Sequence, residues 1–226
     1  LRKLQKLQFI NARNTVLKDI SPLEEHKEIR VLDISATQVG NISILAQFGK
    51  LTELRADHTN ILDLESLKTA PAIQKIYADE TSINNFLVGE FLEKRPGCLV
   101  VYKSTMLEDW WNGLTDDWKQ VFQKQVAINE NSRKEDLHKL VELEVVRFKD
   151  ADVNDLSPLD AFVRLKELEF SGTAISDLSP LSDIKSLKVL HATNSPVRDL
   201  TPLSVLTTLV ELDISNTPVE ELKPIR

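Results

Sequence analysis

The stretch Leu165–Ile184 reads LKELEFSGTAISDLSPLSDI, and its apolar positions recur along the chain with a period of 22. Moved forward by one period, Leu165 and Leu168 fall on Leu187 and Leu190. The copies of the pattern begin at Leu7, Ile29, Leu51, Ile73, Leu143, Leu165, Leu187 and Leu209. Apolar residues that recur at one long period indicate stacked copies of a single supersecondary unit, because one copy cannot bury its own apolar face.

Each copy combines a short alternating segment, a turn and a second apolar run. The alternation of apolar and polar residues in the first part predicts a short strand. The pair Ser179 and Pro180 predicts a helical start, because serine is a favourable N-cap and proline fits the first helical position. Leu178, Leu181 and Ile184 lie three residues apart, which suits a short α or 3₁₀ segment. We therefore expect stacked copies with strands on one face and helical pieces on the other.

The pattern L-x-x-L-x-L-x-x-T/S-x-I resembles the leucine-rich repeat family, and T-x-I-x-D-L-x-P-L resembles its 22-residue bacterial form, as in internalins. The resemblance covers most of the chain. It implies an α/β repeat solenoid with parallel strands on the concave face and short helical or 3₁₀ segments on the convex face. A small helical segment interrupts this solenoid.

One departure from the family pattern is a hydroxyl residue where asparagine is usual. These residues are Thr15, Thr37, Thr59, Thr81, Thr173, Ser195 and Thr217. A hydroxyl can still bond a neighbouring backbone group from inside the turn. Ala151 holds the same place without a hydroxyl, so we expect this ladder to be weakest at the start of the second array.

The repeats form two arrays with a different segment between them. We expect a first array with its terminal strand at 1–102, a helical cap or linker at 103–142, and a second array at 143–226. A further copy would have begun at Arg95, but the second array begins at Leu143. Since their separation of 48 is not a multiple of 22, the two arrays are expected to be out of register.

A strand is expected at 98–102, at the end of the first array. Cys98 and Val100 follow Ile76 and Ala78 by one period, so we expect this strand to occupy the next position in the sheet. Cys98 is then a buried core thiol, which we favour over a nucleophile. A single cysteine also excludes an internal disulfide framework.

Residues 103–142 carry helix signals in place of the repeat. The expected helix starts are Thr105, Thr115 and Ser132, each followed by acidic residues that suit a first turn. We expect three short helices that cover the open end of the second array, because a solenoid must shield its terminal core from water. A hinge or a partner-binding insert is the alternative.

The middle helix carries an apolar stripe of Trp118, Val121 and Phe122. We expect this stripe to pack on the first copy of the second array, near Val146 and Phe148.

Trp110 and Trp111 are adjacent, so they cannot share one helix face. In one interpretation one of them is buried and the other is half covered. In the other interpretation the second tryptophan is a contact site.

Composition limits the classes of partner. The net charge of −7 argues against nucleic acid and against an anionic membrane surface. No apolar run approaches membrane-spanning length, so we expect no membrane insertion. Leu1 and Leu4 fall in register with Leu23 and His26, and the pattern also stops within a copy after Ile225. Both ends cut a repeat, and we expect a piece of a longer protein.

The sequence carries no pattern that is typical of catalysis or of metal binding. The chain has six glycines and no phosphate-cradling glycine loop, and its four histidines lack metal-ligand spacing. Carboxylates are plentiful, but a catalytic site needs groups that converge on a pocket. We therefore predict that the protein is not an enzyme and has no catalytic residue, cofactor or metal site.

The outward positions of the strands remain as the candidate binding face. The predicted partner-binding residues are Phe9, Arg13, Asp33, Arg55, Asp57, His58, Tyr77, Asp79, Arg147, Glu169, His191 and Asp213. Their densest group joins Arg55, Asp57, His58, Tyr77 and Asp79, which include the residue types favoured at interface hot spots. Because leucine-rich repeats commonly bind on this face, the resemblance implies a protein partner.

Two alternatives stay open. A glycan or cell-wall ligand is the first, for which exposed Tyr77, Phe9 and a tryptophan could stack on sugar rings. A structural spacer within a longer surface protein is the second. The resemblance to internalins implies a secreted or cell-surface location.

Overall fold

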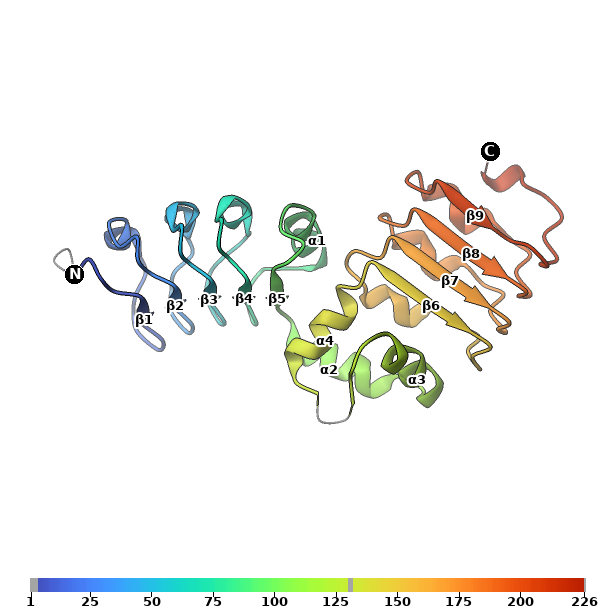
Figure 1. The fold of residues 1–226 in the computed structure, drawn as a ribbon, viewed down its shortest axis with the longest axis horizontal. Coiled ribbons are helices and arrows are strands. Elements are labelled where there is room, and N and C mark those ends of the chain that lie inside the picture. The colour runs from blue at the N-terminus through green and yellow to red at the C-terminus, as the bar shows by residue number, and fades with distance from the viewer. Residues whose placement is uncertain (1–3, 130–131, 226) are drawn as a thin grey trace. The chain divides into compact units, whose positions relative to one another are not determined.

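The computed structural model describes residues 4–129 and 132–225, and the chain divides into two compact units, Leu1–Thr105 and Met106–Arg226 (Figure 1). We refer to them as unit 1 and unit 2. Each contains one parallel sheet, with the neighbouring strands in chain order. Parallel strands in sequential order are what a stack of identical copies produces.

Unit 1 contains a five-stranded sheet with 3₁₀ segments between its strands (Figure 1). The strands are β1 (Phe9–Asn11), β2 (Val31–Asp33), β3 (Glu53–Arg55), β4 (Lys75–Tyr77) and β5 (Leu99–Val101). The connections contain the 3₁₀ helices η1 (Ser21–Leu23), η2 (Ser43–Gln47) and η3 (Glu65–Thr69), then helix α1 (Asn85–Lys94). Ile10 pairs with Leu32, Leu32 with Leu54 and Leu54 with Ile76, so the predicted 22-residue register is confirmed over β1–β4.

The register changes at the last strand of unit 1. Ile76 pairs with Val100, whereas one period would place it opposite Cys98, so the prediction that Cys98 follows Ile76 in register is wrong. The fourth copy contains the ten-residue helix α1 where the earlier copies hold 3₁₀ segments of three to five residues, and this longer element shifts the strand. Cys98 is nevertheless buried, as predicted.

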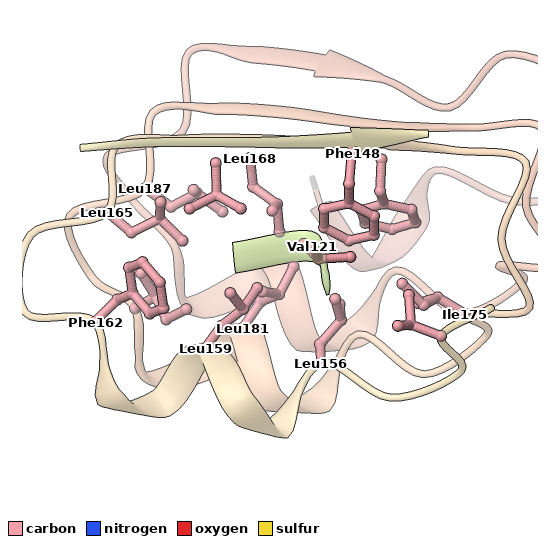
Figure 2. Close-up of a cluster of buried hydrophobic side chains, with 14 of the residues drawn as sticks. Val121, Phe148, Leu156, Leu159, Phe162, Leu165, Leu168, Ile175, Leu181 and Leu187 are labelled. Atoms are coloured by element: carbon pink, nitrogen blue, oxygen red, sulfur yellow. The ribbon is translucent and has the colours of Figure 1, made fainter. Parts of the chain in front are cut away.

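Unit 2 contains a four-stranded sheet in the predicted register. Its strands are β6 (Val145–Lys149), β7 (Glu167–Ser171), β8 (Val189–Thr193) and β9 (Glu211–Asp213). The 3₁₀ helices that follow them are η4 (Ser157–Ala161), η5 (Ser179–Asp183), η6 (Thr201–Val205) and η7 (Lys223–Ile225). Leu168 pairs with Val146 on one side and with Leu190 on the other, and all three are fully buried. Figure 2 shows leucine and phenylalanine side chains filling the space between the strands and the 3₁₀ helices.

The 3₁₀ helices do not begin as predicted. Leu178 is the N-cap of η5, and the Ser179 N–H donates to the Asp177 carboxylate at 2.8 Å, so the prediction of a serine N-cap is wrong. The same contact recurs two residues apart in Asp19/Ser21, Asn41/Ser43, Asp63/Glu65, Asp155/Ser157 and Asp199/Thr201. Hydrogen bonds from Ser179 lower the pKa of Asp177. An acidic or amide residue two positions earlier therefore fixes each of these turns.

The hydroxyl ladder forms at six of the seven predicted positions, whereas the Thr173 hydroxyl accepts the Ile175 N–H at 3.5 Å. The Thr37 hydroxyl donates to the Ile34 carbonyl at 2.7 Å. The same bond to the carbonyl three residues earlier is made by Thr15, Thr59, Thr81, Ser195 and Thr217. These bonds satisfy a backbone acceptor at six of the strand exits.

Three helices precede the sheet of unit 2: α2 (Ser104–Gly113), α3 (Asp116–Gln125) and α4 (Lys134–Val141). Thr115 caps α3 as predicted, because its hydroxyl accepts the Trp118 N–H at 3.3 Å. The other two predicted starts are wrong by a residue or more. Helix α2 already includes Thr105, and the N-cap of α4 is Arg133, whose N–H donates to Asp136.

Helix α3 packs on the first copy of the second array, as predicted. Trp118 packs edge-on against Phe148 with 5.3 Å between the ring centroids. The ring centroids of Phe122 and Phe162 are 5.5 Å apart. The Trp118 indole N–H donates to the Asp155 carbonyl at 3.1 Å. The apolar end of the unit 2 core is therefore covered by this helix.

The two adjacent tryptophans follow the first of the two interpretations. Trp111 is buried, and Trp110 is half-buried with its indole N–H donating to the Pro158 carbonyl at 3.2 Å. Trp110 also lies 5.6 Å from Phe122. Trp111 belongs to the core of unit 2, and Trp110 packs against that core.

A glutamine closes part of the free edge of the unit 2 sheet. The Gln125 side-chain amide donates to the Arg147 carbonyl at 2.7 Å and accepts the Arg147 N–H at 3.3 Å. This amide gives the outer edge of β6 the pair of bonds that a neighbouring strand would supply. Covering an exposed edge in this way prevents unwanted strand pairing.

Candidate binding face

The outward side of the strands, which we call the strand face, is bounded by a backbone position that the sequence did not reveal. At the eighth position of every copy φ is positive, between 48° and 63°. The residues are Asn14, Ala36, His58, Glu80, Asp150, Gly172, Asn194 and Asn216. At Gly172 an added Cβ would collide with the Asp150 carboxylate. The asparagines and the glycine were the available signal, since these residue types favour the left-handed region.

Strand register places the predicted residues of unit 2 in one row. Arg147 pairs with Glu169, Glu169 with His191, and His191 with Asp213. The Arg147 guanidinium lies 2.8 Å from Glu167 and 3.2 Å from Glu169, and His191 Nε2 lies 2.8 Å from a Glu211 oxygen. The row therefore alternates bases and acids, and its two bases already contact carboxylates on neighbouring strands.

In unit 1 the central pair on the strand face is Arg55 and Tyr77, which are direct neighbours in the β3–β4 register. The Arg55 guanidinium lies 5.9 Å from the centre of the Tyr77 ring, within cation–π range. Arg55 Nε also donates to Glu53 at 2.6 Å, and this hydrogen bond raises the pKa of Arg55 above its ordinary value. The arginine side chain is held in place but remains 46% exposed.

Asp57 and Asp79, next to this pair, hold the turns of unit 1. The Asp57 carboxylate accepts the Asp79 N–H at 2.9 Å. The Asp79 carboxylate accepts both the N–H and the hydroxyl of Ser104, at 2.8 and 2.9 Å. Both acids are half-buried, whereas His58 beside them is exposed. Their carboxylates stabilise successive strand exits, which the sequence did not indicate.

The remaining predicted residues of unit 1 differ in exposure. Asp33 is only 3% exposed and accepts the Ser35 N–H at 2.9 Å, so its carboxylate holds the turn that follows β2. In contrast, Phe9 is 56% exposed and Arg13 is exposed on the first copy. Asp33 therefore does not present its carboxylate on the strand face, while Phe9 presents its ring.

A cleft of about 290 Å³ opens in unit 2 between α3 and the strand face. It is lined by Val121, Lys124, Arg147, Phe148, Lys149, Ala151, Glu169 and Ser171. The predicted partner-binding residues include Arg147 and Glu169 but neither Lys124 nor Lys149. Lys124 lies on a helix, and only the packing of that helix brings it next to the strands.

Within residues 4–129 and 132–225, no three His, Cys, Asp or Glu side chains gather closely enough to hold a metal ion. Across the same described ranges, no helix has the length and apolar character needed to cross a membrane.

No protein-family model matches the chain, and no curated protein matches it either. The similar solved structures include three internalins of Listeria monocytogenes. Internalin C2 is 17% identical, with 95% of this chain and 74% of that chain covered and a TM-score of 0.37. Internalin F is 16% identical, with coverage of 99% and 65% and a TM-score of 0.41. The functional domain of InlJ is 17% identical, with coverage of 98% and 47% and a TM-score of 0.36.

The chain thus spans between about half and three quarters of the internalin chains that it resembles. Because these TM-scores lie below 0.5, the fold assignment rests on the chain's own geometry. Parallel strands in 22-residue register, followed by 3₁₀ segments, form a leucine-rich repeat solenoid. The predicted fold class is confirmed.

Proposed function

We propose that this chain is a non-catalytic binding module that recognises a protein partner through its strand face. The observation that carries the proposal is the pair Arg55 and Tyr77 on the unit 1 sheet. Arginine and tyrosine are enriched among the residues that dominate binding energy at protein interfaces. Glu53 already orients the guanidinium, so little side-chain entropy is lost when a partner binds.

The row in unit 2 supports the same proposal. Arg147, Glu169 and His191 alternate basic and acidic side chains across adjacent strands and offer polar groups at fixed spacing. Such a pattern favours specificity and orientation more than affinity, because exposed charges contribute little energy each. We infer that unit 1 supplies the principal anchor and unit 2 supplies complementary polar contacts.

A glycan ligand is the second candidate, and two rings on the strand face favour it: Phe9, which is 56% exposed, and the half-buried Tyr77. The tryptophans that could stack on sugars are committed elsewhere, since Trp111 and Trp118 are buried and Trp110 packs in the unit 2 core. On the resemblance to internalins, we also propose a secreted or cell-surface location.

The proposal is tested by comparing partner capture from extracts with glycan-array binding for the same variants. Arg55→Ala and Tyr77→Ala should each weaken capture of the partner, by about 30-fold for a hot spot worth about 2 kcal/mol. Glu65→Ala is the matched control, because Glu65 is 66% exposed on η3 of the same repeat as Arg55. Equal capture by Arg55→Ala and the unmodified chain would contradict the proposal. Saturable sugar binding that Tyr77→Ala abolishes would favour the glycan.

A further inference from the structure

The cleft between α3 and the strands of unit 2 has a cationic rim and an apolar floor. Lys124, Arg147 and Lys149 contribute three cations, against the single carboxylate of Glu169 among the lining residues. The apolar lining comes from Val121, Phe148 and Ala151. Figure 2 shows Val121 and Phe148 next to each other where α3 meets the sheet. A cationic rim stands out in a chain whose net charge is −7.

The charges of the two lysines are only weakly compensated within unit 2. No described carboxylate contacts Lys124 at ion-pair distance, and the nearest ion-pair partner of Lys149 is Asp150 at 4.0 Å. Arg147 differs, because its guanidinium already contacts two glutamates. Lys124 and Lys149 therefore remain available for an anionic group that enters between helix and sheet.

The walls of the cleft are held in a fixed relation. Gln125, next to Lys124 in the chain, makes two hydrogen bonds to the backbone of Arg147. Nearer the start of the helix, the buried Trp118 packs edge-on against Phe148. These contacts fix helix α3 against β6, so a ligand meets a preformed site and orders few side chains on binding.

The size of the cleft limits what can enter. Its volume of about 290 Å³ lies just below the range for ligand pockets, roughly 300–1,000 Å³. It therefore suits one or two side chains of a larger partner better than a whole cofactor. The charge selects an anion, and the apolar floor suits an aliphatic neighbour.

We propose that this cleft receives an aspartate or glutamate side chain of the protein partner, with an adjacent aliphatic residue on the floor formed by Val121, Phe148 and Ala151. The inference rests on the proposed function and names the chemistry of the partner at one site. The partner carboxylate lies between the ammonium groups of Lys124 and Lys149. Arg147 stays paired with its glutamates and shapes the wall.

Two labelled peptides test the proposal on the full chain by fluorescence anisotropy. One alternates Glu and Val, and the other has Gln in place of every Glu. The Glu peptide should bind more tightly, and its affinity should fall as salt is raised. Lys124→Gln and Lys149→Gln should each weaken it about twofold to fivefold, as expected for partly exposed ion pairs. Lys188→Gln removes an exposed lysine outside the cleft and should leave the affinity unchanged.

Three results would overturn the inference: no saturable binding of the Glu peptide, equal binding of the Gln peptide, or no effect of the lysine variants. A single-stranded RNA oligonucleotide is the further arm. RNA binding that is tighter than peptide binding and is lost in the same lysine variants would assign the cleft to phosphate instead. Capture of the partner that depends on Arg55 but not on Lys124 or Lys149 would refute the acidic contact while leaving the proposed function intact.

Discussion

The substitution Leu168→Ala tests the repeat architecture most sharply. Leu168 is fully buried between Val146 and Leu190 on the neighbouring strands. The parallel hydrogen-bond ladders on both sides hold the backbone, so the space left by the leucine cannot close by collapse. Leucine-to-alanine changes in such sites cost about 2–5 kcal/mol, and we expect the upper half of that range. For a unit of this size, the melting temperature should fall by about 10–20 °C.

Tryptophan fluorescence during thermal unfolding is the suitable assay, because Trp110, Trp111 and Trp118 all belong to unit 2. Glu169→Ala is the matched control, since Glu169 is the next residue and its side chain is 49% exposed. The control should change stability by no more than about 0.5 kcal/mol. Equal losses for the two variants would refute the inward and outward register given above.

Three further predictions concern the cap and the turns. Gln125→Ala should lower the free energy of unfolding of unit 2 by about 1–2 kcal/mol in denaturant, because the hydrogen bonds to the edge strand are lost. The exposed Gln123→Ala is the control, and an equally small change for both variants would show that Gln125 does not close the edge. Residues 143–226 expressed without the three helices should aggregate or melt well below the form that includes 103–142; an unchanged melting temperature would exclude the cap. The pKa of Asp177 is lowered by hydrogen bonds from the turn serine, so its contribution is present at neutral pH and is lost as pH falls through the folded-state pKa, below the ordinary 3.8. Asp177→Asn keeps an acceptor, as Asn41 does in its own copy, and should flatten the acid side of a melting-temperature profile; an unchanged acid side would contradict this.

Much of the fold follows from the sequence because every copy has leucines at the same positions, and these leucines must be buried in the same way. Leu168 and its equivalents must face inward in every copy, which fixes strand, register and stacking together. The same reasoning failed at Val100, because α1 lengthens the fourth copy by two residues and shifts the register of the next strand. A shift of two residues leaves the same side chains pointing inward, so the alternation in the sequence does not reveal it. Spacing alone therefore cannot locate a strand that follows an element of different length.

The turns were harder to predict because neighbouring polar residues compete for the same backbone groups. Asp177 and Ser179 can both cap a helical turn, and the structure uses the aspartate. Asp33 sits at an outward position by alternation, yet its carboxylate folds back onto the Ser35 N–H and is buried. Alternation predicts the side of the sheet for a residue but not whether its polar atoms bond locally.

The cleft beside α3 could not be predicted from the sequence, because its lysines come from separate elements. Lys124 and Lys149 are separated along the chain and belong to different elements, and only the docking of α3 on β6 brings them to one cleft. That docking depends on aromatic contacts such as Trp118 on Phe148. The sequence predicted the contact between α3 and the first copy, but which lysines this contact brings together is seen only in the folded structure.

Site-specific photo-crosslinking tests the proposed partner recognition most directly. A photoreactive amino acid replaces Lys75, an exposed residue of β4 beside the pair Arg55 and Tyr77. The chain is then irradiated in a cell extract that contains candidate partner proteins. The same amino acid at Leu62, which is 67% exposed outside the strands, is the control. We predict a discrete protein adduct at position 75 that Arg55→Ala abolishes and that position 62 does not give. No adduct at position 75, or the same adduct at both positions, would contradict recognition through the strand face.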